Sequence, residues 1–156
     1  MLRPATVADA PMLARLHVRA WRETYPGLLP DAEIASRTIE TRTAQWTAQF
    51  AAGTSRIVVI PDLGFAQSGP QRGDLSLAPR YPDELQALYL LRAGQGRGLG
   101  QALFQAVRGE VPFTAMVLDA NTRACRFYER YGGVLLDVRD ELIGQTLVRD
   151  RIYGWG

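Results

Sequence analysis

The segment at residues 92–104, RAGQGRGLGQALF, limits the folds open to this chain more than any other stretch. Four glycines alternate along it before an apolar helical pattern begins: Gly94, Gly96, Gly98 and Gly100. Glycine loses more backbone entropy on ordering than any other residue, so a cluster at a helix start is expected to serve a ligand. A phosphate that must touch the backbone at a helix N-terminus is the simplest such ligand.

The glycine segment lies between two apolar runs that are typical of strands, residues 85–91 and 113–118. A strand, a helix and a second strand in this order form a right-handed parallel unit. The other predicted elements are a helix from Thr6 to the break at 25–27, a helical region from about Asp31 to Gly53, strands over 57–60 and 64–68, a loop over 69–83, a helix over 121–131 and a hairpin of 134–142 with 146–153. Because the remaining strands follow an antiparallel pattern, we predict an α/β fold with a mixed sheet.

Composition is that of an ordinary globular domain. The 156 residues, 47% apolar and 22% charged, predict one domain over residues 1–156. No run approaches the roughly 18 apolar residues of a membrane span, and MLRPATVADAP lacks the apolar region of a signal peptide. A single cysteine, Cys125, fits a reducing cytoplasm. All 18 basic residues are arginines, and because they are scattered we expect no nucleic-acid partner. Without an apolar span we expect no membrane partner either.

Three phosphate-binding patterns compete for the glycine segment. A Walker A loop requires lysine, which the chain lacks. A dinucleotide site requires G-x-G-x-x-G, but the third glycine position holds Gln101; Asp119 could supply the ribose contact, so this alternative stays open. The third pattern, Gln95-x-x-Gly98-x-Gly100, removes side chains from the helix entrance, so that backbone N–H groups can face a pyrophosphate.

A second motif follows 26 residues later, at 121–133, NTRACRFYERYGG. Asn121, Ala124 and Tyr128 fall broadly on one side of a helix there, with Phe127 and Tyr131. Ala124 is small enough to let a ligand pass close to the helix. Tyr128 carries a hydroxyl that can donate a proton, although a tyrosine at this spacing is by itself more typical of an apolar core.

Together the two motifs resemble the acetyl-CoA signature of the GNAT superfamily of N-acetyltransferases, in which [R/Q]-x-x-G-x-[G/A] precedes an N-x-x-A-x-x-F-Y helix. The stretches LHVRAWRETYPGLLP, ALYL and IYGW are also similar to small bacterial members, so the resemblance covers nearly the whole chain. It implies a mostly antiparallel sheet with helices on both faces and a central parallel strand–helix–strand unit. It further implies acetyl-CoA as the acyl donor, no metal, and a homodimer as a common assembly.

The resemblance assigns roles residue by residue. The backbone of residues 95–101 would cradle the pyrophosphate: Gln95, Gly96, Arg97, Gly98, Leu99, Gly100 and Gln101. Leu88, Tyr89 and Leu90 would pair with the pantetheine arm, and the Leu88 N–H would face the thioester oxygen. Asn121 and Ala124 would border the same arm. Tyr128 would protonate the leaving thiolate.

The acceptor side is less specified. Glu84 lies where some family members carry a general base, but a solvated carboxylate at a strand start is an equal alternative. Trp21, Arg22 and Tyr25 lie in the region that lines the family's acceptor pocket. We expect His17 to be a partly buried, hydrogen-bonded histidine, and Cys125 to be a small helix residue without a paired base.

These features predict transfer of an acetyl group from acetyl-CoA to a primary amine of a small molecule or protein. A non-catalytic acyl-CoA-binding module is the alternative from another functional class. One departure from the family pattern is Gly133, which stands where an apolar or aromatic residue is common. The sequence does not name the amine.

Overall fold

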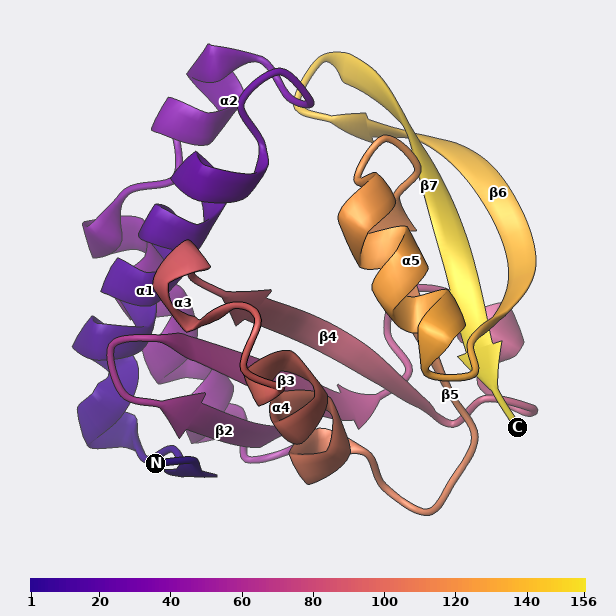
Figure 1. Cartoon of the computed structure of the whole chain (residues 1–156), viewed down its shortest axis with the longest axis horizontal. Coiled ribbons are helices and arrows are strands. Elements are labelled where there is room, and N and C mark those ends of the chain that lie inside the picture. The colour runs from indigo at the N-terminus through magenta and orange to yellow at the C-terminus, as the bar shows by residue number, and fades with distance from the viewer. The chain divides into compact units, whose positions relative to one another are not determined.

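The computed structural model describes residues 1–156, which form two compact units, Met1–Gly69 with Gln86–Arg108 and Pro70–Leu85 with Gly109–Gly156. The first unit holds β1 (Arg3–Pro4), α1 (Ala10–Thr24), α2 (Asp31–Ala35), α3 (Ile39–Ala52), β2 (Arg56–Ile60), β3 (Gly64–Pro70) and α4 (Leu99–Val107). The second holds β5 (Phe113–Leu118), α5 (Thr122–Arg130), β6 (Val134–Ile143) and β7 (Thr146–Trp155). Strand β4 (Asp83–Leu90) contributes its first residues to the second unit and the rest to the first. Figure 1 shows these helices and strands.

The helix predicted from Thr6 is present, but its first residues form a 3-10 turn and α1 itself begins at Ala10. The Asp9 carboxylate accepts the Thr6 N–H at 2.8 Å and pairs with Arg3, so the predicted capping box is confirmed. A 3-10 turn over Val7–Asp9 leads into α1. The helix ends at Thr24, and the backbone turns away at Gly27, whose φ is +81°.

The helical region predicted from Asp31 to Gly53 is two helices. The short α2 ends before residue 36, and α3 begins after Thr38, whose side chain accepts the Thr41 N–H at 3.1 Å. Gly53 ends α3 in the left-handed conformation, with a φ of +66°. The N-cap at Thr38 therefore starts a second helix within a segment that the apolar spacing predicts as one helical region.

Helices cover both faces of the strands in the first unit. Ile57, Val59 and Phe65 point into a core that includes Leu13 of α1 and Trp46 of α3. On the opposite face, Ser68 Oγ and Arg56 Nε both donate to the carbonyl of Val107, the last residue of α4. This arrangement confirms the prediction of helices on both faces of the strands.

The second unit is an antiparallel sheet with α5 against it. Strand β7 pairs with β6 along most of its length and with β5 over residues 150–155, and Gly144, at φ +63°, lies in the tight turn between β6 and β7. Tyr128 of α5 packs against Tyr153 and Trp155 of β7. Figure 1 shows the orange helix α5 beside the yellow strand β7. Both the predicted helix and the predicted hairpin are therefore confirmed.

Parallel pairing is confined to β4 and β5, where Asp83, Glu84 and Leu85 face Phe113, Thr114 and Ala115. This confirms the predicted parallel unit. The hydrogen-bonded strand order is β1-β2-β3-β4-β5-β7-β6. The pairs β1–β2, β2–β3, β5–β7 and β6–β7 are antiparallel. The dinucleotide alternative is wrong, because it requires a doubly wound parallel sheet. No helix combines the length and apolarity that crossing a bilayer requires.

Candidate active site

The glycine segment presents a row of backbone donors at the start of α4. Within the structure, the N–H groups of residues 96–100 have no acceptor, whereas the Ala102 N–H donates to the Gly98 carbonyl at 3.1 Å. Gly96 and Gly98 hold this shape with φ values of +80° and +74°, which side-chain-bearing residues rarely adopt. A Cβ added at either glycine would meet no atom within 4 Å, so the backbone conformation and not steric crowding favours glycine at both positions.

Two side chains fasten this turn to the chain before it. Gln95 Nε2 donates to the Leu90 carbonyl at 3.0 Å, and Arg97 Nη2 donates to the Ala93 carbonyl at 3.1 Å. The Gln95 side chain therefore links the glycine turn to the end of β4 by a hydrogen bond. The exposed Arg97 is close enough to the turn to add positive charge beside the free N–H groups.

The second half of β4 offers backbone groups on one side. The Leu91 N–H donates to the Leu63 carbonyl at 2.8 Å, on the β3 side. Because successive residues in a strand alternate, the N–H groups of Leu88 and Leu90 point away from β3. The pairing of β4 with β5 ends at Leu85, so these groups are not used in that ladder. Tyr89 differs: its backbone faces β3 and its side chain packs on the core beside α1.

Aromatic side chains gather where α1 ends. Trp21 and Tyr25 meet edge to face with ring centroids 4.8 Å apart, and the Tyr25 and Tyr89 hydroxyls are hydrogen-bonded at 2.9 Å. Burial raises the pKa of Tyr89, although the bond from Tyr25 offsets part of this rise. The structure thus brings together two of the three predicted acceptor residues.

Arg22, the third predicted acceptor residue, lies elsewhere on α1. It lines a groove of about 470 Å³ together with the exposed Arg15 and Arg19. Asp62, in the turn between β2 and β3, and Leu91, directly after β4, also line the groove. Trp21 and Tyr25 do not line this groove, so the three residues do not form one cluster.

His17 is partly buried as predicted, but the expectation that its ring nitrogens are hydrogen-bonded fails at Nδ1. Its ring lies among Trp46, Phe65 and Tyr89, with centroids 5.3 to 5.7 Å away, and its Nδ1 has no hydrogen-bond partner. Burial, reinforced by the charge of Arg42, lowers the pKa of His17 to about 3. The imidazole is therefore neutral at physiological pH.

The second motif is placed by α5. Asn121 is the N-cap, and its Oδ1 accepts the Ala124 N–H at 3.3 Å, which leaves its amide group with donors for a further partner. Tyr128 is 7% exposed and packs against Tyr153 and Trp155. Asn121 and Tyr128 thus come from one short helix whose start is fixed by its own cap.

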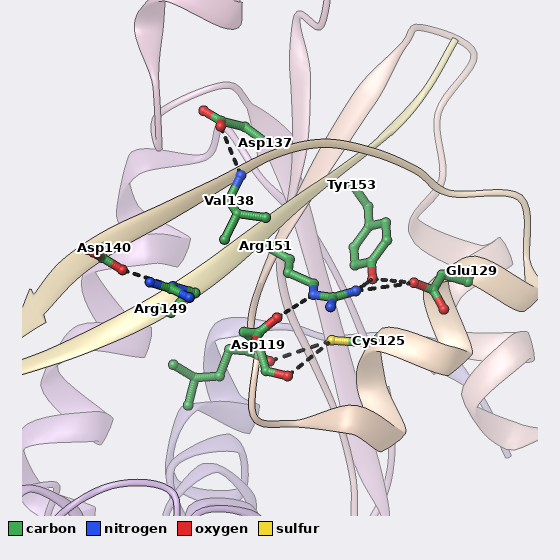
Figure 2. A network of polar contacts seen from close by, with 10 residues as sticks. Asp119, Cys125, Glu129, Asp137, Val138, Asp140, Arg149, Arg151 and Tyr153 are labelled. Atoms are coloured by element: carbon green, nitrogen blue, oxygen red, sulfur yellow. Dashed lines mark hydrogen bonds and ion pairs between the residues drawn. The ribbon is translucent and has the colours of Figure 1, made fainter.

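A polar network holds α5 onto β7 (Figure 2). Arg151 Nε bonds Asp119 at 2.5 Å, and Arg151 Nη1 donates to the Tyr153 hydroxyl at 3.2 Å. That hydroxyl in turn donates to Glu129 of α5 at 2.7 Å. Burial raises the pKa of Tyr153 to about 12, with Glu129 adding to the rise, so this hydroxyl keeps its proton.

Cys125 and Gly133 both have structural explanations. Cys125 is buried, its Sγ lies 3.6 Å from the Leu118 carbonyl, and burial raises the pKa of its thiol, which disfavours the nucleophilic thiolate. At Gly133 a Cβ would lie 2.8 Å from Trp155 Cζ2 and 2.9 Å from the Tyr128 carbonyl oxygen. Trp155 thus occupies the space that a larger residue would need at 133.

Glu84 is held by the loop before β4. Its Oε1 accepts the Arg72 N–H at 3.2 Å and lies 3.5 Å from Arg72 Nε. Burial raises the pKa of Glu84, and the backbone N–H groups of Arg72 and Gly73, with the Arg72 charge, offset part of the rise. The carboxylate is therefore both desolvated and partly engaged.

Sequence reasoning missed Arg37 and Arg42. Arg42 is only 8% exposed, and its guanidinium carbon lies 4.9 Å from the centroid of the Trp21 ring, as does that of Arg37. The available signal was the position of Arg42 in α3, directly beside Ile39, Thr43 and Trp46 on the predicted apolar side.

Comparison with known proteins agrees with this architecture. The profile of the Acetyltransferase (GNAT) family matches residues 12–133. Uncharacterized N-acetyltransferase YuaI of Bacillus subtilis (strain 168) is 32% identical over 107 residues, which span 65% of this chain and 58% of that relative. The chain belongs to the GNAT family of acetyltransferases.

Solved structures show the same fold. The putative acetyltransferase yncA from Salmonella typhimurium, solved with its cofactor acetyl-CoA, matches with a TM-score of 0.69 at 19% identity, over 99% of this chain and 92% of that one. PaiA N-acetyltransferase from Thermoplasma acidophilum, in complex with coenzyme A, matches with a TM-score of 0.70 at 16% identity, over 96% of each chain.

Proposed function

We propose that this chain is an N-acetyltransferase that moves the acetyl group of acetyl-CoA directly to a primary amine. The observation that carries the proposal is the row of unpartnered N–H groups at residues 96–100, which opens α4 through Gly96 and Gly98. Such donors at a helix N-terminus suit a diphosphate, which coenzyme A contains. A relative solved with acetyl-CoA supports the same cofactor.

Acetyl-CoA supplies an acyl group activated as a thioester. We assign the Leu88 N–H as the donor to the thioester oxygen, because it points away from β3. The amide of Asn121 and the small side chain of Ala124 serve the pantetheine arm, and the hydroxyl of Tyr128 donates a proton to the leaving sulfur. Residues 95–101 hold the diphosphate.

The acceptor amine must lose a proton to attack, and Glu84 is our candidate base. Burial raises its pKa toward the working range, which favours this role. The Glu84→Gln variant should lose the acidic limb of the pH–rate profile, and an unchanged profile would remove Glu84 from the mechanism. The Tyr128→Phe variant should bind acetyl-CoA normally and turn over more slowly; undiminished turnover would exclude the hydroxyl.

The first experiment compares thermal unfolding with acetyl-CoA, NAD, ATP and no ligand. A ligand at about 100 times its Kd adds about 2.7 kcal/mol, or roughly 5 to 11 °C for a chain of this size. A rise with acetyl-CoA alone, followed by CoA release with an amine panel, supports the enzyme. Binding without release from any amine would favour the non-catalytic module, and no rise with acetyl-CoA would refute the proposal.

One domain over residues 1–156, a homodimer, a cytoplasmic location and the absence of a nucleic-acid or membrane partner belong to the same proposal. Their support is the family resemblance, the lone Cys125 and the scattered arginines. Gel filtration with light scattering tests the assembly directly.

A further inference from the structure

A buried guanidinium in the first unit has one edge without a partner. Arg42 Nη1 donates to Gln45 Oε1 at 3.1 Å, but Arg42 Nε and Nη2 are both buried and make no hydrogen bond. Nε and Nη2 form the side edge of the guanidinium plane. Two parallel N–H groups on one edge match the two oxygens of a carboxylate.

The surroundings of Arg42 are cationic and aromatic. The Arg37 and Arg42 guanidinium carbons each lie 4.9 Å from the centroid of the Trp21 ring. The groups that act on the charge of Arg42 are Arg37, Tyr25 and Tyr89, and none of them is a carboxylate. Burial, with the charge of Arg37, lowers the pKa of Arg42, in keeping with its two unpartnered nitrogens.

Arg37 and Trp21 supply further unpartnered donors at the same place. Arg37 Nε and Trp21 Nε1 are buried without hydrogen bonds, while Arg37 Nη2 lies 3.9 Å from Glu33. Glu33 is thus the one carboxylate paired with this group, and it lies at ion-pair distance from Arg37 alone. Two neighbouring arginine charges with buried, unpaired N–H groups lower the stability of the folded state unless an anion binds between them.

We infer that Arg42, with Arg37 and Trp21, binds a carboxylate of the acceptor, so that the amine substrate is one that carries a carboxylate, such as an α-amino acid. The inference rests on the proposed function, because it assigns the acceptor of the same reaction. Trp21 and Tyr25 belong to the predicted acceptor region, and Tyr25 is hydrogen-bonded to Tyr89 beside this cluster. The same chemistry disfavours polyamines and aminoglycosides, which offer the two arginines only further positive charge.

The test compares L-amino acids with their carboxamides in acetyl-CoA-dependent CoA release, and by calorimetric binding in the presence of CoA. The wild type should prefer the acids. In Arg42→Met, which keeps the length but removes the charge, the KM for the acids should rise roughly 10- to 100-fold, while that for the amides changes little. Arg42→Lys should recover only part of the preference, because lysine lacks the two-pronged edge.

Stability separates a binding role from a structural one. An unpaired buried cation costs stability, so Arg42→Met should unfold at the same or a higher temperature than the wild type. A structural arginine would instead lower the unfolding temperature when it is replaced. Arg149→Met, which removes an exposed arginine whose side chain is 62% accessible, is the matched control and should keep the wild-type preference.

The outcomes distinguish this inference from the proposed function. Acetyl-CoA should stabilise the wild type and Arg42→Met equally. If it stabilises neither protein, the proposed function fails. Calorimetry with the acids and amides then still tests the carboxylate site. A wild type that binds acetyl-CoA yet shows no preference for acids, in turnover or in binding, overturns the inference. An Arg42→Met variant that keeps the full preference overturns it as well.

Discussion

Replacing Gly98 by alanine should lower both the stability of the fold and the affinity for acetyl-CoA, and the two losses can be measured separately. Gly98 has a φ of +74°, and an alanine there would cost about 1 to 2 kcal/mol in backbone strain. No atom lies within 4 Å of the added Cβ, so no clash adds to this cost. For a chain of this size the loss corresponds to a fall in unfolding temperature of about 2 to 8 °C.

A backbone strained at residue 98 should also disturb the N–H row that we assign to the diphosphate. Losing one hydrogen bond to a charged group costs about 1.5 to 3 kcal/mol, so the Kd for acetyl-CoA should rise about 10- to 150-fold. Isothermal titration calorimetry measures this affinity, and thermal unfolding measures the strain.

Gly53→Ala is a control matched in strain. Gly53 also has a positive φ, +66°, and also has open space around its Cβ position, but it ends α3 rather than opening α4. Both variants should lose similar stability, and only Gly98→Ala should lose affinity. If the Gly98→Ala variant binds acetyl-CoA as tightly as the Gly53→Ala variant, our assignment of the glycine turn is incorrect.

Two further predictions concern stability. In Gly133→Ala the new Cβ would lie 2.8 Å from Trp155 Cζ2 and 2.9 Å from the Tyr128 carbonyl oxygen, so urea unfolding should show a loss of about 1 to 3 kcal/mol; an unchanged midpoint would contradict the close packing. Burial, with the nearby Glu141 carboxyl, raises the pKa of Asp150 from its ordinary 3.8 to about 6. The folded state therefore binds more protons than the unfolded chain between about pH 4 and 6, and this group's contribution to stability falls as the pH rises through that window. Asp150→Asn should accordingly raise the unfolding temperature at pH 7.5 more than at pH 4, and an equal change at both values would refute the shift.

Local sequence signals predicted most of the secondary structure because each of them acts over a few residues. Thr6 and Asp9 form the capping box, and Gly53 ends its helix. The strand over Phe113–Leu118 has the predicted bounds. The division between α2 and α3 was missed, because Thr38 forms its cap with Thr41, a pair that lacks the usual glutamate or glutamine.

The sequence by itself determined the glycine turn and the start of α5, since Gly98 and Asn121 act on their own backbone neighbours. Tertiary structure decided what long-range packing controls. It buried Arg42 against Trp21, separated Arg22 from Tyr25, and left His17 Nδ1 without a partner. Burial and charge depend on residues from distant parts of the chain, so side-chain environments of this kind follow only from the folded structure.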